Sequence, residues 1–344
     1  MWDDVPLKFR SHPAGSVQCV TVGGVEHRFA LPITLTPYVA TQACSARCVF
    51  CSENLRRSGE TRVASRLRPH GDYFGGLQQA LAALRDLDLG ISISGLEATD
   101  DLPWLESLVS TLQTAERARQ QAFREKILYS NGAGLAEAGA SASVLRALQA
   151  FGLQRIEWSR HSDRQAENDA IMRFHRGVAV ADNRAFSASV ARVQGMIPVV
   201  LVCVVQHGGV ASAAQVEDYV RWAESLGVRQ VVFREFARPG DGYRAGRTLD
   251  VIRSRRVDCE ALVEAVLNER IGFEPVARTE GYYFRNWELN WSSRVQVVFE
   301  ASDYAQMHAR HASELIYKLV YHANGRLTSD WSPDRHILLK THEH

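Results

Sequence analysis

Strand-like and helix-like segments alternate along most of this chain of 344 residues, and this alternation restricts the fold more than any other feature. Six runs rich in apolar and β-branched residues are separated by segments whose apolar residues recur every three or four positions, as in amphipathic helices. Runs such as PVVLVCVVQ are apolar on both faces, which is typical of a parallel sheet covered by helices. The sequence therefore predicts an α/β fold built from βα units with right-handed crossovers. The predicted strands span residues 33–39, 90–95, 125–131, 153–159, 198–206 and 228–236.

Three cysteines follow the first predicted strand, in the string ACSARCVFCSEN. Cys44, Cys48 and Cys51 have the spacing C-x3-C-x2-C, and the aromatic Phe50 stands just before the last of them. Three thiolates can bind three irons of a four-iron cluster and leave the fourth iron open to another ligand. A structural zinc site usually closes with four ligands in two pairs, and no second C-x2-C or H-x3-H pair lies nearby. The loop favours a cluster with one open iron, with a zinc site as the alternative.

This cysteine string resembles the signature of the radical S-adenosylmethionine (SAM) superfamily, which combines the same spacing with an aromatic residue before the third cysteine. Over roughly residues 34–240 the chain resembles the molybdopterin-precursor cyclase branch of that superfamily. The resemblance implies a [4Fe-4S] cluster on the three cysteines, with SAM on the open iron and Phe50 among the cofactor contacts. It also implies that an electron, delivered by a donor such as a flavodoxin or ferredoxin, splits SAM. The resulting 5'-deoxyadenosyl radical then removes a hydrogen atom from the substrate.

The same resemblance implies a partial (βα)6 barrel of the TIM type, and the number of predicted strands agrees with it. Residues 1–31 contain two short β-like runs joined by Gly-Gly, which predict an N-terminal β hairpin. Residues 32–240 form the predicted barrel. The alternation fades near residue 256, and we expect 241–344 to be an α+β extension that closes the barrel and its substrate site.

In barrels of this kind the chemistry lies at the ends of the strands. The second predicted strand ends in Ser-Gly-Leu-Glu, where the family has a Gly-Gly-Glu-Pro-like turn for the amino group of SAM. The resemblance makes Gly95 and Glu97 cofactor contacts, and Gly95 suits a close approach of backbone to ligand because it has no Cβ. Leu96 and Ala98 depart from the family pattern. An ordinary strand-to-helix turn with an acidic residue is the alternative.

Three further segments look like family positions near SAM. Ser130 and Asn131 resemble a Thr-Asn-Gly turn suited to the ribose hydroxyls or the SAM carboxylate, although Asn-Gly is also an ordinary turn dipeptide. Glu157 and Ser159, on the fourth predicted strand, are candidates for hydroxyl binding. Arg173 in NDAIMRF is the candidate for the SAM carboxylate, which a guanidinium fork suits. An ordinary surface arginine is the alternative for that position.

Substrate contacts are expected on the sixth predicted strand and in the aromatic segment YYFRNWELNW. Arg234 and Glu235 point to opposite faces of a strand, so one of them should face the interior, as a substrate contact or in a structural ion pair. Tyr283, Arg285 and Asn290 suit a polar ring. The alternative is a surface strand whose aromatic residues cover the end of the barrel.

The cysteines outside the loop bear on two further features of the family, a hydrogen-atom donor and auxiliary iron–sulfur clusters. Cys203, in VVLVCVV, is a candidate hydrogen-atom donor, although a buried strand cysteine is usually a small hydrophobe. No cysteine follows Cys259, so the C-terminal auxiliary clusters of many relatives are not expected.

The chain starts MWDDVPLKFR, without a secretory leader, and has no apolar run near the ~18 residues of a membrane span. We therefore expect reduced thiols, a cytoplasmic location and no membrane partner.

The charge balance disfavours a nucleic-acid partner. Forty basic residues face 39 acidic ones, the net charge is +1, and no basic stripe is visible. We expect a radical SAM enzyme acting on a small polar substrate, a sugar- or nucleoside-like intermediate of specialised metabolism. The reaction classes that fit are dehydrogenation, epimerisation, decarboxylation and rearrangement. The alternatives are radical SAM modification of a peptide or tRNA, and a non-catalytic zinc or iron–sulfur binding module.

Overall fold

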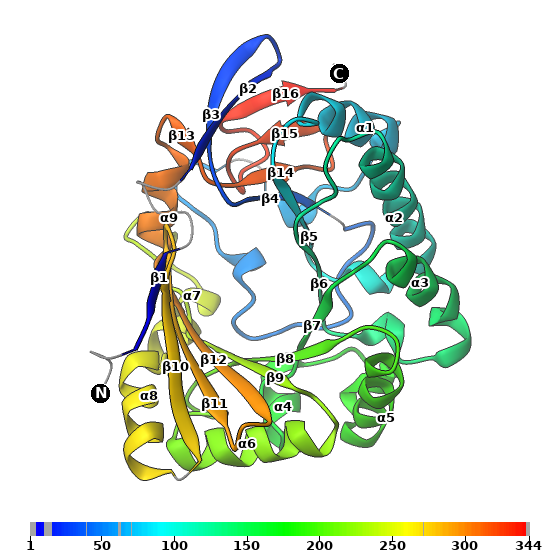
Figure 1. Cartoon of the computed structure of the whole chain (residues 1–344). Coiled ribbons are helices and arrows are strands. Elements are labelled where there is room, and N and C mark those ends of the chain that lie inside the picture. Colours follow the sequence, from blue (N-terminus) through cyan, green and yellow to red (C-terminus); the bar gives the residue numbers. More distant parts are fainter. Residues whose placement is uncertain are drawn as a thin grey trace.

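The computed structural model of the chain describes residues 5–9, 16–38, 40–60, 63–69, 71–270 and 272–341. Within them a mixed sheet of 13 strands dominates (Figure 1). Its central strands are parallel, and neighbours in the sheet are neighbours in the sequence. The α/β prediction with a parallel sheet is therefore confirmed. The central strands are β4 (Ile33–Pro37), β5 (Leu89–Ile93), β6 (Lys126–Ser130), β7 (Arg155–Ser159), β8 (Val199–Val204) and β9 (Gln230–Arg234).

Two later strands extend the parallel run at its two edges. β12 (Val295–Ser302) pairs in parallel with β9, and β14 (Leu319–Tyr321) pairs in parallel with β4. In Figure 1 the strands curve around an interior that the segment following β4 crosses. The last third of the chain thus lengthens the sheet at both edges of the central strands.

Helices cover the outer face of the central strands (Figure 1). α2 (Leu102–Arg117) begins after Asp101, whose carboxylate accepts the backbone N–H of Trp104 at 3.0 Å. Such an N-cap satisfies donors that the first helical turn leaves free, which explains why α2 begins where it does. The other covering helices are α1 (Tyr73–Ala83), α3 (Ala138–Ala150), α4 (Gln165–Met172), α5 (Asn183–Gln194) and α6 (Ala213–Ser225).

The strands are buried on both faces. All five residues of β5 are buried, and on β9 Phe233 packs on Tyr219 of α6 with ring centroids 5.4 Å apart. Because successive side chains alternate, Val232 then points to the opposite face, into the interior. There it belongs to a separate apolar cluster, made of Val200, Val202, Val232 and Val298.

The C-terminal region adds an antiparallel meander of β10 (Phe273–Glu280), β11 (Phe284–Trp291) and β12. The aromatic segment of the sequence is β11. Its Trp287 and Trp291 are buried in the main core, whereas Arg285 and Asn290 are exposed. Three helices lie in this region: α7 (Arg247–Arg255), α8 (Cys259–Glu269) and α9 (Tyr304–His311).

A small second sheet contains the hairpin β2 (Val17–Val22) and β3 (Val25–Ala30), with β13 (Leu315–Ile316) as its third strand. β1 (Leu7–Phe9) lies apart from it, parallel to β10 at the far edge of the main sheet. Residues 1–4 and 10–15 of the predicted N-terminal hairpin lie outside the described residues. β15 (Arg326–Thr328) and β16 (Ile337–Lys340) complete the other edge of the main sheet. Among the described helices, none has the length and apolar character needed to cross a bilayer.

A cavity around the three cysteines

A cavity of about 330 Å3 opens where the carboxyl ends of β5 to β9 meet the cysteine loop. We call it the cysteine cavity. It collects most of the side chains that the sequence singled out, although these come from five separate segments of the chain. Its lining includes Cys44, Cys48, Phe50, Cys51, Gly95, Glu97, Ser130, Asn131, Ser159, Arg234 and Glu235.

The three cysteines are free thiols, each half-buried. Burial raises the pKa of Cys44 to about 12 and that of Cys51 to about 11. Burial also raises the pKa of Cys48, and the charges of Cys51 and Cys44 raise it further, so the sulfurs lie within electrostatic reach of one another. Within the described residues, no three His, Cys, Asp or Glu side chains are grouped closely enough to hold a single metal ion. The donor set is three soft thiols on one cavity, which fits a thiophilic iron–sulfur cluster.

Residues 171–175 hold the cysteine loop by backbone hydrogen bonds. The Arg47 N–H donates to the Met172 carbonyl at 3.0 Å, and the His175 N–H donates to the Ser45 carbonyl at 2.9 Å. Ala46 and Phe174 form an antiparallel bridge between these bonds. The chain after α4 therefore fixes the position of the thiols, a partnership that no local sequence pattern indicates.

Glu97 is the centre of a buried hydrogen-bond network. Its side chain is 6% exposed, and its Oε1 accepts from the Thr99 backbone at 2.9 Å and from the Thr99 and Ser130 hydroxyls, each at 2.7 Å. Its Oε2 accepts the Asn131 N–H at 2.5 Å. Burial raises the pKa of Glu97 to about 7, although these donors favour the charged form. We call Glu97, Thr99, Ser130 and Asn131 the Glu97 rim.

Asn131 joins this rim to the cysteine loop. Its amide nitrogen donates to Ser45 Oγ at 3.0 Å and lies 3.6 Å from Cys44 Sγ. The next residue, Gly132, has φ +80°, and a Cβ built there would lie 1.8 Å from the Trp158 ring. Trp158 in turn donates to the Asn131 carbonyl at 2.8 Å. Only glycine fits this turn, because any side chain would collide with the indole.

His161 is a cavity residue that the sequence analysis missed. Its Nδ1 accepts the Val204 N–H at 3.0 Å, which places the proton of the neutral ring on Nε2. Burial, with Arg160 and Arg234 as further causes, lowers the pKa of His161 to about 3. The Phe50 ring packs edge-on against it at 4.9 Å. The signal in the sequence was a histidine two positions after a predicted strand end.

Glu157 does not line the cysteine cavity, contrary to the prediction for this residue. It is buried on β7, and its carboxylate lies 3.0 Å from Arg155 Nη2 and 3.6 Å from Arg234 Nη2. Arg234 also contacts Glu300 at 2.7 Å. Charges inside a sheet are stable only when paired, and here the pairing continues across several strands. We call this set the interior ion-pair chain; it comprises Glu125, Arg155, Glu157, Arg234 and Glu300.

Arg234 and Glu235 both border the cavity, but both already have charged partners. Glu235 is hydrogen-bonded to the Arg256 guanidinium and accepts the Cys259 N–H at 2.9 Å, at the start of α8. The alternative of structural ion pairs therefore describes their contacts here.

Arg173, the candidate for the SAM carboxylate, lies outside the lining of the cysteine cavity. It ends α4 in a left-handed conformation with φ 51°, and its side chain is exposed. It lines a separate surface hollow together with Arg47, His175 and Arg176. The segment around Arg173 lies beside the cysteine loop, but the backbone directs the Arg173 side chain to the surface.

Cys203 points away from the cysteine cavity. It is fully buried in the core between sheet and helices, and its neighbour Val202 faces the interior. Its thiol lies 3.5 Å from the His161 carbonyl. Cys203 thus does not line the cysteine cavity, and its surroundings are those of the small buried hydrophobe that was the alternative.

The predicted substrate residues of the aromatic segment separate as well. Arg285 and Asn290 are exposed on β11 and do not line the cysteine cavity. Tyr283 lines a neighbouring cavity together with Tyr304 of α9. β11 itself is a strand of the main sheet that buries Trp287 and Trp291 in the core.

Comparisons with known proteins show the fold. No known family profile and no curated protein matches the sequence. Among solved structures, Streptococcus suis SuiB bound to precursor peptide SuiA has a TM-score of 0.53 at 12% identity, over 88% of this chain and 60% of that one. SuiB bound to S-adenosylmethionine gives 0.49 at 13% over 87% and 60%, and methylornithine synthase PylB gives 0.42 at 13% over 69% and 63%. The chain thus has the fold of SuiB and spans under two thirds of the length of these proteins.

Proposed function

We propose that this chain is a radical SAM enzyme with one [4Fe-4S] cluster bound by Cys44, Cys48 and Cys51. One observation supports the proposal above the others: the three free thiols of the C-x3-C-x2-C loop face the same cavity as the Glu97 rim. The shared fold with SuiB agrees with it. We further propose that β4 to β9, within residues 32–240, are the partial (βα)6 barrel of such enzymes, and that 241–344 close it.

When bound, the cluster and SAM would supply a 5'-deoxyadenosyl radical able to remove a hydrogen atom from a substrate. This chain's residues would bind and orient them. The cavity volume of about 330 Å3 falls in the range of small-molecule sites, about 300–1,000 Å3. Glu97 Oε2 accepts one hydrogen bond from the described residues and can accept a second from an amino group. Ser130, Asn131 and Ser159 offer short polar groups to ribose or carboxylate oxygens.

The substrate we propose is a small polar molecule, sugar- or nucleoside-like, modified by dehydrogenation, epimerisation, decarboxylation or rearrangement. The ends of β8 and β9 and the valine cluster below them would exclude water from the reacting atoms. A peptide substrate is the second candidate, because the solved SuiB structure of the same fold contains a precursor peptide. The net charge of +1 gives no support to tRNA.

We also propose an anionic electron-transfer protein, such as a flavodoxin or ferredoxin, as partner. The hollow beside the cysteine loop is lined by Arg47, Arg173, His175 and Arg176, and we call it the basic patch. Its three arginines have no ion-pair partner among the described residues, and the chain as a whole is close to neutral. Arg47 belongs to the cysteine loop itself, so a donor docked on the patch would lie next to the thiols.

Oxygen-free reconstitution with iron and sulfide tests the proposed function. We expect about four irons per chain, a visible thiolate-to-iron absorption band, and dithionite-dependent formation of 5'-deoxyadenosine from SAM. The Cys44→Ala, Cys48→Ala and Cys51→Ala variants should lose both the band and the product. Cys19→Ala is the matched control, because Cys19 is an exposed free thiol on the hairpin. A protein that binds one zinc and never cleaves SAM would instead be a binding module.

A further inference from the structure

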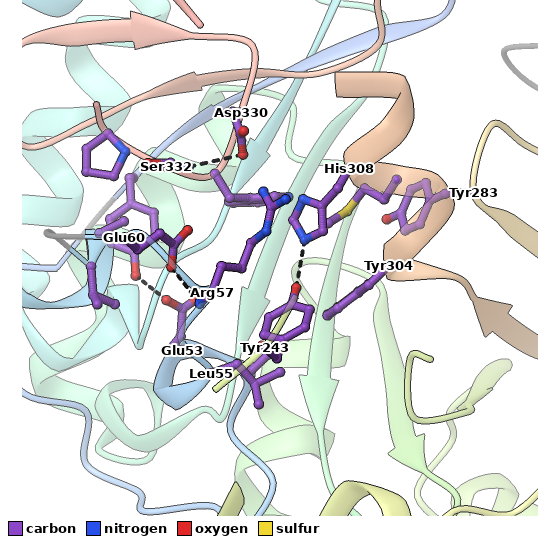
Figure 2. A pocket seen from close by; sticks show the side chains of 17 residues that line it. Glu53, Leu55, Arg57, Glu60, Tyr243, Tyr283, Tyr304, His308, Asp330 and Ser332 are labelled. Carbon is purple, nitrogen blue, oxygen red and sulfur yellow. Dashed lines mark hydrogen bonds between the residues drawn. The ribbon is translucent and has the colours of Figure 1, made fainter. Parts of the chain in front are cut away.

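A second cavity adjoins the cysteine cavity, and Figure 2 shows its walls. It has a volume of about 220 Å3 and is formed by the segment after Cys51, by α9 and by the loop around Asp330. We call it the outer chamber. Its volume is below the roughly 300–1,000 Å3 of sites that enclose a whole ligand, so it suits one end of a molecule that continues into the cysteine cavity. The two cavities share Ser52, Glu53, Leu55 and Tyr304.

Arg57 places a guanidinium in the outer chamber that has no partner among the residues that the structure describes. The backbone of Arg57 is fixed, because its N–H donates to Glu60 Oε2 at 3.0 Å and the residue forms a bridge with Tyr243. Its side chain has no hydrogen bond or ion pair with any described residue, and Figure 2 shows it extending toward His308. A half-buried guanidinium is best satisfied by a planar anion, and a carboxylate matches its fork.

The wall beside Arg57 is formed by neutral groups. The Tyr243 hydroxyl and His308 Nε2 are hydrogen-bonded at 2.7 Å. Burial lowers the pKa of His308 to about 4, and Arg57 is the second cause, so the imidazole stays neutral near pH 7. His308 therefore adds no positive charge, and the charge available to an anion comes from Arg57.

Three carboxyl groups share the chamber with this guanidinium. Glu53 accepts the Tyr38 hydroxyl at 2.8 Å. Asp330 is 3% exposed and accepts the Ser332 N–H at 3.2 Å. Among the described residues, Glu60 accepts only the Arg57 N–H named above. Since a carboxylate offers about four acceptor positions, each of the three can accept further hydrogen bonds. Figure 2 shows Glu53 and Glu60 on one side of Arg57 and His308 on the other.

This mixture of charges selects among ligands. A purely anionic group would face three carboxyl groups, and a purely cationic group would leave Arg57 unpaired beside a second positive charge. A neutral sugar would satisfy neither charge. Because the chamber is small, a ligand that satisfies both must have its two charges close together.

We propose that the outer chamber binds the α-amino acid group of a small molecule, with its carboxylate on Arg57 and its ammonium among Glu53, Glu60 and Asp330. The inference rests on the proposed function of the cysteine cavity and narrows its substrate to a molecule that ends in a free amino acid. Residues inside a peptide chain have no such group, because their amino and carboxyl functions are amides. The chamber thus favours a small molecule over a precursor peptide.

The test measures binding by ligand-observed NMR, without reductant, on iron-loaded protein saturated with SAM. The probes are the twenty protein L-amino acids at millimolar concentration, and for each one that binds, its methyl ester and its N-acetyl form. We expect at least one amino acid to bind. Each derivative should bind at least about tenfold more weakly, because it loses one charged hydrogen-bonding partner.

Substitutions at Arg57 locate the site. Arg57→Gln should weaken binding about tenfold or more, and Arg57→Lys should fall between, because an ammonium keeps the charge without the fork. Arg56→Gln is the matched control: it changes the neighbouring arginine, which does not line the chamber. Thermal unfolding of all three variants shows whether they fold.

Three results would overturn the inference: no amino acid binds, an ester binds as well as its acid, or folded Arg57→Gln binds as the parent does. Saturable binding of adenosine or a plain sugar to the chamber in place of amino acids would also overturn it. Failure of the proposed function is detected by different measurements, because it would appear as missing iron or missing SAM cleavage. The inference can therefore fail while the proposed function holds, and the two failures are distinguishable.

Discussion

Two buried glutamates on neighbouring parts of the sheet have opposite surroundings. In the Glu97 rim the described residues hold the carboxylate only by neutral donors, namely backbone N–H groups and the hydroxyls of Thr99 and Ser130. In the interior ion-pair chain the carboxylate of Glu157 is held by two guanidiniums, those of Arg155 and Arg234. Burial raises the pKa of both, but only at Glu157 do positive charges oppose it.

The contrast separates a site that can take a ligand from a contact that holds strands together. Neutral donors leave the charge of Glu97 uncompensated, at the edge of a cavity where an incoming amino group can meet it. The arginines around Glu157 cancel its charge and link β7 to β9 and β12. The sequence analysis named both glutamates as candidate cofactor contacts. In the structure their partners differ, neutral donors for Glu97 and guanidiniums for Glu157.

The largest effect on stability should come from the interior ion-pair chain. Glu157→Ala leaves Arg155 and Arg234 without a shared carboxylate, and breaking a buried pair costs about 3–5 kcal/mol. Glu97→Gln keeps the shape and loses charge-assisted bonds, which costs about 1–3 kcal/mol. Urea unfolding followed by circular dichroism measures both, with exposed Glu274→Ala as control. A larger loss for Glu97→Gln than for Glu157→Ala would reverse the comparison.

The second test uses pH to sharpen the same contrast. The folded pKa of Glu97, about 7, lies above its usual value of 4.5, so the folded state binds this proton more tightly than the unfolded state. Its contribution to the free energy of unfolding is complete below pH 4.5 and is lost as pH rises through 7. The expected loss is up to about 3 kcal/mol, at 1.36 kcal/mol per pKa unit. Unfolding curves of the parent and of Glu97→Gln at pH 5 and pH 8 isolate this contribution. A difference in unfolding free energy between the two proteins that does not change with pH would contradict the prediction.

A third test asks whether the Glu97 rim depends on the packing behind it. Gly132→Ala drives a Cβ into the Trp158 ring, and overpacking of this kind costs about 1–3 kcal/mol beyond the strain of a positive φ. Gly227→Ala has a similar φ of +78° with nothing within 4 Å of its Cβ, so only the strain of about 1 kcal/mol applies. Thermal unfolding compares the two. Equal losses would mean that Trp158 yields and that the rim is not fixed by it.

The smallest effect on stability is expected at the basic patch, which lies outside both regions. Arg176→Glu should change the free energy of unfolding by less than about 0.5 kcal/mol, because its side chain is exposed. At low salt it should slow reduction by a reduced flavodoxin several-fold and leave reduction by dithionite unchanged. Arg253→Glu, on α7, is the control of equal charge change. Slower reduction by both reagents would place the effect in the thiol loop instead of in docking.

Much of the fold follows from local patterns. The predicted strands at 90–95, 125–131 and 153–159 correspond to β5, β6 and β7 within a few residues, because apolar runs bounded by turns report burial directly. β12 and β14 lie in residues 241–344, which were expected only to form an α+β extension. Their pairing with β9 and β4 joins residues far apart in the sequence, which no local periodicity encodes.

The candidate site divides in the same way. Cys44, Cys48, Cys51 and the turn at Asn131 were marked by spacing and by glycine, and they meet in one cavity. Arg173 was assigned from the resemblance of its segment, but the left-handed backbone at the end of α4 directs its side chain to the surface. The outer chamber was not anticipated, since its walls come from residues near 57, 243, 308 and 330.

The sequence by itself determined which segments become parallel strands and which loop has the thiols, because both depend on short-range spacing. The tertiary structure decided which charged side chains are neutralised and which remain available to a ligand. That outcome depends on partners brought together from distant strands and on how deeply each group is buried, and neither quantity exists until the chain has folded.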